Sequence, residues 1–324
     1  DYQLTDRFQL TLGLRYTEDD KKINRGLLFG GPLAAGESIP EVDLTSADDQ
    51  WNEVTYKVGL DYSIREDLLL YTSYSRGYKS GGFNAVDSEG SYDPEAINAL
   101  EVGLKSQWLD NRFQANLAAY YYDYEDKQEG VRRIIGTNPV TGEPLVFSAI
   151  ENAGAATIYG IELEIEARIT TALRVDAALG YMHSEYDEFE SVDITDPSLG
   201  SQDLSGNQLN RAPEWKFHIG SQYEWVLSRD LGSLTARVDY TWSDSYFARQ
   251  FNLGSDVIPS YSRSNARLKW LNSDGRWQAE LYVLNIEDDD DLTNFFELGA
   301  GEGFDHNLSF LPPRTYGMKV RYIY

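Results

Sequence analysis

Residues 161–168 read IELEIEAR, and apolar residues alternate there with charged ones: Ile161, Leu163, Ile165 and Ala167 against Glu162, Glu164, Glu166 and Arg168. Successive side chains of a β-strand point to opposite faces, so this alternation predicts a strand with one apolar and one strongly polar face. The same period of two recurs at 8–17, 54–62, 215–224 and 316–324. The sequence therefore predicts an all-β protein.

The connections between the predicted strands alternate between short and long. Short, turn-like connections fall at 5–7, 65–67, 110–112, 170–172, 228–232 and 272–275, and long ones at about 24–50, 80–95, 131–152, 187–213, 251–259 and 287–313. About twelve strands lie between them, each long enough to cross a bilayer when tilted, which takes ~9–11 residues. Short turns at one end and long loops at the other predict a transmembrane antiparallel up-and-down β-barrel. A β-sandwich or propeller would need two buried faces or blade repeats, which the sequence lacks.

Composition narrows the classes of function. The 324 residues include 28 Lys and Arg against 53 Asp and Glu, a net charge of −25 that falls mostly in the long connections. Nucleic acid is excluded as a partner, because phosphate binding needs a cationic face. The absence of Cys excludes disulfides and thiol nucleophiles, and 3 His do not favour a multi-histidine metal site. The chain has neither an N-terminal Met nor a signal peptide, so we expect a fragment or a processed product.

Several motifs follow one another along the chain: YSRGYKSGGFN at 74–84, PE at 94–95 with LEVGLK at 100–105, YYYDY at 120–124 with Gln128, NAG at 152–154 with GIELE at 160–164, LSGN at 204–207 with APEW at 212–215, VLNI at 283–286, and PRTYG at 313–317. In this order they resemble the barrel of TonB-dependent outer-membrane receptors. The resemblance implies a barrel of about 22 strands around an N-terminal plug domain. This chain contains neither the plug nor a TonB box, and residues 1–4 resemble the end of a strand. We expect residues 1–324 to be the C-terminal part of such a barrel; an independent barrel of twelve strands is the alternative.

The resemblance also implies the function and the partners. We expect a receptor of the bacterial outer membrane that takes up a scarce ligand with energy from the TonB complex, most often a ferric siderophore, and otherwise a carbohydrate or cobalamin. A passive, porin-like diffusion channel is the alternative, and an enzyme is not expected because no nucleophile or acid–base cluster stands out. The expected partners are TonB, outer-membrane lipid and the barrel-assembly machinery, which reads the terminal aromatics Tyr322 and Tyr324. No cofactor is expected.

Candidate site residues fall into two groups. Ligand contacts are expected at the ends of strands and in long connections, at Tyr78, Phe83, Asn84, Arg132, Arg133 and His306. The alternatives are girdle positions for the first three, local salt links for the two arginines, and plain exposure for His306. Plug-facing positions in the lumen, or ion pairs with adjacent strands, are expected at Arg76, Lys79, Glu162, Glu164 and Glu166. Glu162, Glu164, Glu166 and Arg168 follow one another on one face of one strand and do not make an acid–base pair with separated pKa values, so catalysis is not expected.

Metal binding is considered at two places. The acidic run Glu287–Asp291 could hold Ca²⁺ through carboxylate oxygens. It lacks the spacing of a dedicated calcium loop, so we expect a solvated loop base and no metal site. His183 and His218 lie on predicted strands far apart in the sequence, and we expect them to make hydrogen bonds in the lumen rather than to bind a metal.

Overall fold

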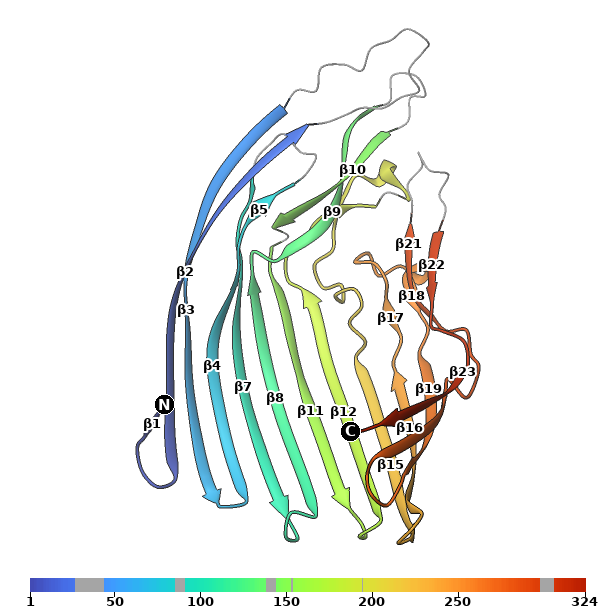
Figure 1. Cartoon of the computed structure of the whole chain (residues 1–324). Coiled ribbons are helices and arrows are strands. Elements are labelled where there is room, and N and C mark those ends of the chain that lie inside the picture. Colours follow the sequence, from blue (N-terminus) through green and yellow to red (C-terminus); the bar gives the residue numbers. More distant parts are fainter. Residues whose placement is uncertain (27–43, 85–90, 138–143, 153, 194, 298–305) are drawn as a thin grey trace.

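A single antiparallel sheet dominates the computed structural model, which describes residues 1–26, 44–84, 91–137, 144–152, 154–193, 195–297 and 306–324. The sheet has thirteen strands, which curve side by side like the wall of a barrel (Figure 1). In order they are β1 (Tyr2–Gln3), β2 (Phe8–Gly26), β3 (Leu44–Arg65), β4 (Leu68–Lys79), β7 (Glu95–Trp108), β8 (Phe113–Glu125), β11 (Ala156–Arg168), β12 (Leu173–Tyr186), β15 (Trp215–Ser228), β16 (Gly232–Ser243), β19 (Tyr261–Leu271), β20 (Trp277–Leu284) and β23 (Thr315–Tyr322). The predicted antiparallel architecture is confirmed, with β1 as a two-residue addition to twelve long strands.

The long connections gather at one end of the sheet, at the top of Figure 1, and the short turns lie at the other end. We call the connections 80–94, 126–155, 187–214, 244–260 and 285–314 the loop layer. They contain β5 (Gly82–Phe83), β6 (Ser91–Tyr92), β9 (Gln128–Thr137), β10 (Pro144–Asn152), β13 (Glu190–Val192), η1 (Pro197–Leu199), β14 (Ser201–Asp203), β17 (Tyr246–Phe247), η2 (Gly254–Asp256), β18 (Val257–Ile258), β21 (Leu292–Glu297) and β22 (His306–Phe310). Neither of the short helices in the described ranges is long and apolar enough to cross a membrane.

The strands extend further into the loop layer than the sequence predicts. Strand β2 continues to Gly26 and β3 starts at Leu44, where a loop was expected over 24–50. The charged residues there face one another across the ladder, with Lys21 opposite Asp49 and Lys22 opposite Asp48. Opposite charges on paired positions stabilise an antiparallel ladder, so these polar residues continue the strands instead of ending them.

The two faces of the sheet differ sharply. Large apolar side chains stand exposed on one face, with Leu14 at 79% and Tyr316 at 77% exposure. We call this the apolar face; it also carries Val58, Leu100, Val102, Leu117, Ile161, Leu179, Val238, Leu281 and Met318. The alternate residues form the polar face, which includes Arg15, Lys57, Glu101, Glu162, Asp176, Arg237 and Glu280. A soluble protein would bury such an apolar face.

Buried apolar clusters occur in the loop layer and at the strand ends that border it. One joins Val131, Ala149, Ala156, Tyr186, Phe189, Leu204, Leu209, Ala212 and Phe251. A second joins Tyr246, Ala248, Ile258 and Phe295. Within the described ranges, the apolar core of this protein therefore lies at the long-loop end and not between layers of strands.

Three glycines on the polar face allow tyrosine rings to lie across the sheet. Gly103 pairs with Tyr71, Gly160 with Tyr120 and Gly317 with Tyr282. A Cβ atom at any of these glycines would collide with the ring or hydroxyl of its tyrosine partner. The glycines therefore make room for a ring against the backbone of the neighbouring strand.

Candidate functional site

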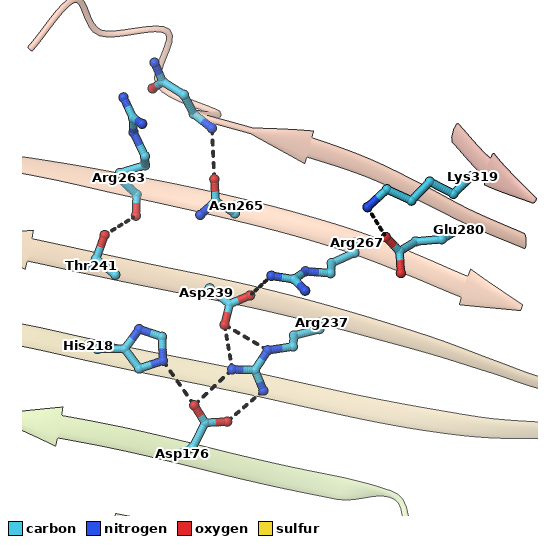
Figure 2. A network of polar contacts seen from close by, with 11 residues as sticks. Asp176, His218, Arg237, Asp239, Thr241, Arg263, Asn265, Arg267, Glu280 and Lys319 are labelled. Carbon is cyan, nitrogen blue, oxygen red and sulfur yellow. Dashed lines mark hydrogen bonds and ion pairs between the residues drawn. The ribbon is translucent and has the colours of Figure 1, made fainter. Parts of the chain in front are cut away.

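A network of ion pairs crosses the polar face from β12 to β19 (Figure 2). Arg237 of β16 donates two hydrogen bonds to the carboxylate of Asp176 on β12, at 2.7 and 2.9 Å. Its Nε also donates to Asp239 at 2.8 Å, and Arg267 of β19 lies 3.6 Å from the other Asp239 oxygen. Because each carboxylate faces a cation, the network is balanced, and it joins the three strands β12, β16 and β19.

Gly220 of β15 makes the network possible. It lies between Asp176 and Asp239 in the register, and a Cβ there would collide with the Arg237 guanidinium and the Asp176 carboxylate. The guanidinium therefore crosses above the backbone of β15. The sequence analysis did not identify Asp176, Arg237 or Asp239, although Gly220 interrupts a polar face that is otherwise lined by long side chains.

The two strand histidines lie on different faces. Nε2 of His218 is 3.1 Å from Oδ2 of Asp176, which confirms a hydrogen bond on the polar face. His183 instead pairs with the exposed Tyr159, and the two rings are 4.9 Å apart. This register places His183 on the face of Ile161, opposite to the polar face that carries His218.

Glu162, Glu164 and Glu166 stand in a row on the polar face of β11 and are exposed. No other described residue donates a hydrogen bond or forms an ion pair to these three carboxylates. Beside them a groove of about 200 Å³ is lined by Asn116, Asp176 and His218 as well as Glu164 and Glu166. The row thus presents acceptor oxygens to whatever occupies the space next to the polar face.

The two cations predicted for the lumen are already paired. The Arg76 guanidinium donates to Glu53 of β3 at 2.9 Å and to Glu125 of β8 at 3.0 Å. Arg76 directly follows Ser75, the last β4 residue that pairs with β3. The side chains of Arg76, Glu53 and Glu125 therefore link β4 to β3 and β8 where the β3–β4 ladder ends. Lys79 lies 3.6 Å from Glu95, its partner across the β4–β7 ladder. Both side chains therefore bond to adjacent strands.

Three predicted ligand contacts, Tyr78, Phe83 and Asn84, lie at the end of β4 and in the connection that follows it. Tyr78 lines a space of about 400 Å³ together with Arg15, Asp19 and Arg76. The ring of Phe83 stands edge-on to buried Trp51, with centroids 5.7 Å apart.

Asn84 has a structural task. Its amide donates to the carbonyl of Ile150 at 2.9 Å and accepts from the Ile150 N–H at 2.7 Å. The side chain thereby joins the β4–β7 connection to β10. Asn152 does the same from β10, donating to the carbonyls of Asp93 and Asp126 and accepting from the Asp93 N–H.

Comparison with known proteins decides the family. Residues 1–286 match the family model described as TonB dependent receptor-like, beta-barrel. The chain belongs to this family. It is 25% identical over 299 residues to the probable TonB-dependent siderophore receptor PiuA of Acinetobacter baumannii, covering 88% of this chain and 35% of that protein. It is 24% identical over 326 residues to the pesticin receptor of Yersinia pestis, covering 99% of this chain and 42% of that protein.

Solved structures agree on the fold. The ferric yersiniabactin uptake receptor FyuA from Yersinia pestis superposes with a TM-score of 0.75 at 21% identity, over 98% of this chain and 43% of that one. The siderophore receptor PiuA from Acinetobacter baumannii gives 0.73 at 20% identity, over 99% and 41%. This TonB-dependent receptor-like barrel thus spans less than half the length of these relatives.

Three predicted ligand contacts of the TonB-dependent receptor-like barrel lie outside the described side chains. The backbones of Arg132 and Arg133 lie in β9 and that of His306 in β22, while their side chains are outside the described residues.

At the C-terminus, the ring of Tyr322 packs 4.9 Å from Trp277 and 5.1 Å from Tyr324.

The acidic run at the start of the last long connection caps backbone groups in this TonB-dependent receptor-like barrel. Glu287 accepts from the Ser264 N–H and Asp288 from the Arg314 N–H, both at 2.9 Å. Burial pushes the pKa of Glu287 up, but hydrogen bonds from Ser264 outweigh it and the pKa falls below its usual value. Asp291 has a raised pKa because of burial and the neighbouring Asp289. Among the described residues no group of three or more His, Cys, Asp or Glu could hold a metal ion.

Proposed function

We propose that this chain supplies wall and loops to an outer-membrane transporter that takes up a scarce ligand, with a ferric siderophore as the first candidate and energy from the TonB complex. The observation that carries the proposal is the sheet of a TonB-dependent receptor-like barrel with one exposed apolar face and one charged face. Proteins of this family are receptors and transporters. The barrel then performs no covalent chemistry: its strands form a rigid wall and its loops select the ligand.

The apolar face supports placement in the bacterial outer membrane. Phe8 stacks on Tyr62 near the short turns, with ring centroids 4.4 Å apart, and Tyr16 stands exposed further along β2. From Phe8 to Tyr16 the strand covers about 27 Å at ~3.4 Å per residue. Outer-membrane barrels carry an apolar band of about 25 Å between two aromatic girdles. In this placement the loop layer is extracellular, lipid covers the apolar face, and β23 with Tyr322 and Tyr324 is the part that the barrel-assembly machinery reads.

The polar face supports a partner inside the barrel. Glu162, Glu164 and Glu166 are exposed and, in the described part of the chain, unbonded, so they suit cations of a plug domain. Arg76 and Lys79 are held by carboxylates of the wall, so their contact with a plug is the weaker part of the proposal. We further propose that residues 1–324 are the C-terminal part of a larger barrel, since the chain covers 35% and 42% of the two curated relatives.

The ligand assignment rests on the relatives. They include a probable siderophore receptor, and a similar structure is a ferric yersiniabactin uptake receptor. Candidate contacts in this chain are Tyr78, Phe83, Arg132, Arg133 and His306 at the loop end, where cations and aromatic rings suit an anionic ferric chelate. The Asn84 amide bonds to Ile150, so a ligand contact there would have to displace a backbone link.

Uptake of ⁵⁵Fe tests the proposal. The complete native gene is expressed in a bacterial host that lacks its own siderophore receptors, and ferric yersiniabactin, a ferric catecholate and a ferripyoverdine are supplied in turn. We expect saturable uptake of at least one chelate, lost in a host without TonB and after a protonophore collapses the inner-membrane proton gradient. Uptake that persists without TonB and extends to unrelated small solutes would mean a passive channel. TonB-dependent uptake of cobalamin or an oligosaccharide instead would overturn only the ligand assignment.

A further inference from the structure

The β16–β19 connection lies between the two buried apolar clusters of the loop layer. Phe251 belongs to the cluster that includes Phe189 and Leu204 of the β12–β15 connection. Tyr246 and Ile258 belong to the cluster that includes Phe295 of β21. One connection of the chain therefore packs against two others.

A buried arginine stands at the first of these contacts. The Arg249 side chain is 13% exposed and donates from Nε to Asp256 at 2.7 Å and from Nη1 to Asp193 at 2.9 Å. Asp256 belongs to the same connection as Arg249, whereas Asp193 belongs to the β12–β15 connection. The two carboxylates are 0% and 3% exposed. The guanidinium thus compensates two buried negative charges that lie on different connections.

Each carboxylate is held in place by its own connection. Asp193 Oδ1 accepts from the backbone N–H and the hydroxyl of Thr195, at 2.9 and 2.8 Å. Asp256 Oδ2 accepts from the Leu253 N–H at 3.1 Å. Short local bonds within each connection therefore orient both carboxylates toward the Arg249 guanidinium.

Amide groups add a second link between the same two connections. The Asn252 side chain accepts from the Gln208 N–H at 2.7 Å and donates to the Gln208 carbonyl at 3.0 Å. The Asn207 amide donates to the Gln250 carbonyl at 3.0 Å. Every one of these bonds would break if either connection moved alone.

We propose that Arg249 is a positioning residue that makes the β12–β15 and β16–β19 connections open and close as one body. Moving one connection away from the other would leave buried Asp193 without its cation, which costs more than moving both together. The β21–β22 hairpin is attached to this body more loosely, through the Tyr246 hydroxyl, which donates to the Thr293 carbonyl at 2.6 Å. A ligand that contacts one of the two connections therefore shifts the equilibrium of both.

Hydrogen exchange of backbone amides tests the coupling without any ligand. The protein from the complete gene is purified in detergent, and Arg249→Met is compared with the wild type by mass spectrometry. We expect exchange in 187–214 and 244–260 to rise together, by on the order of tenfold or more, while β12 and β16 stay unchanged. Arg249→Lys keeps the positive charge but loses the planar guanidinium that donates to two carboxylates at once. Both segments should therefore be better protected than in Arg249→Met but less than in the wild type. A rise confined to 244–260, or no rise, would overturn the proposal.

Two further variants keep the test decisive if Arg249→Met does not fold. Asp193→Asn lies in the other connection and should still raise exchange in 244–260. Combined with Arg249→Met it should add little, because the ion pair is already lost; full additivity would mean that the connections open independently. Tyr246→Phe is the matched control, because it removes only the bond to the Thr293 carbonyl. It should loosen the β21–β22 hairpin and leave 187–214 at its wild-type rate.

Discussion

The sheet and the loop layer of this barrel protein are stabilised in opposite ways. On the sheet, Leu14 and Tyr316 are 79% and 77% exposed. In the loop layer, Leu204 is 3% exposed and Ile258 is completely buried. In the proposed membrane placement, lipid takes the place of a core for a strand whose backbone groups are already paired, whereas loops that face water must bury apolar groups of their own. In that placement the position of the core marks the boundary between the two solvents.

Replacing Phe189 by alanine should produce the largest effect and confine it to the loop layer and the strand ends that border it. The ring is 4% exposed and lies 4.8 Å from Tyr186. Removing a buried ring of this size costs about 3–5 kcal/mol. Hydrogen exchange should report that loss as faster local opening of 187–214 and of the loop-side ends of β11 and β12, which carry Ala156 and Tyr186 of the same cluster. The protection of the rest of β11 and β12 should stay unchanged. If the rest of these strands lost protection as well, the two regions would share one core and the contrast between them would fail.

Adjacent residues of β8 separate the two faces of the sheet. Leu117 is exposed on the apolar face, and its neighbour Asn116 lines the groove on the polar face. Leu117→Arg places a charge in lipid and should lower the free energy of unfolding by about 2–4 kcal/mol. Asn116→Arg, the matched control, should change it by less than about 1 kcal/mol. Denaturant titration of both variants in phospholipid vesicles measures the difference, and equal losses would show that the apolar face does not meet lipid.

The smallest expected effect is a pH dependence within the loop layer. The folded-state pKa of Asp291 is raised by burial and by Asp289, so its carboxyl group stabilises the β20–β23 connection when protonated. That contribution is present below the ordinary pKa of 3.8 and is lost as the pH rises through the folded-state value. Asp291→Asn should therefore slow exchange around β21 at neutral pH and flatten its pH profile.

Asp203→Asn is the control of opposite sign. Hydrogen bonds from the Ser205 hydroxyl and N–H lower the pKa of Asp203, so its contribution is present above the unfolded-state pKa and lost as the pH falls. This variant should open the β13–β14 hairpin at neutral pH. Parallel behaviour of the two variants would contradict the assignment for Asp291.

The fold was predictable because a barrel strand repeats one simple pattern. Alternation such as that of Ile161–Glu166 is local, and strict alternation of short and long connections orders the strands. Contacts across several strands were not predictable in this way. Asp176 and Arg237 are 61 residues apart and meet only because β15 holds the register between them. The face of His183 was not predicted, because a single polar residue on an alternating strand does not reveal its neighbour Tyr159.

Site residues in the loop layer were predicted by position but not by partner. Asn84 was predicted as a ligand contact from its position, but the pairing of its amide with the backbone of Ile150 was not predicted. Nothing in the sequence around Arg249 indicates that Asp193 will lie beside it, because the two side chains come from different connections. Secondary-structure propensity and hydrophobic periodicity describe one segment of the sequence at a time. The structure of the loop layer depends on how its five connections pack against one another.

The glycine–tyrosine pairs on the polar face set a rule for how related sequences can diverge. Any side chain at Gly103 would occupy the space of the Tyr71 ring, and the same holds for Gly317 with Tyr282. Each of these two pairs can therefore change only in concert: a smaller residue must replace the tyrosine before a larger one can replace the glycine. At Gly160 a side chain would also collide with the backbone carbonyl of Tyr181, so this glycine should stay intolerant even without Tyr120. Across homologues the other two pairs should covary as independent doublets, and a deep mutational scan should find each of their glycines intolerant until its tyrosine is removed.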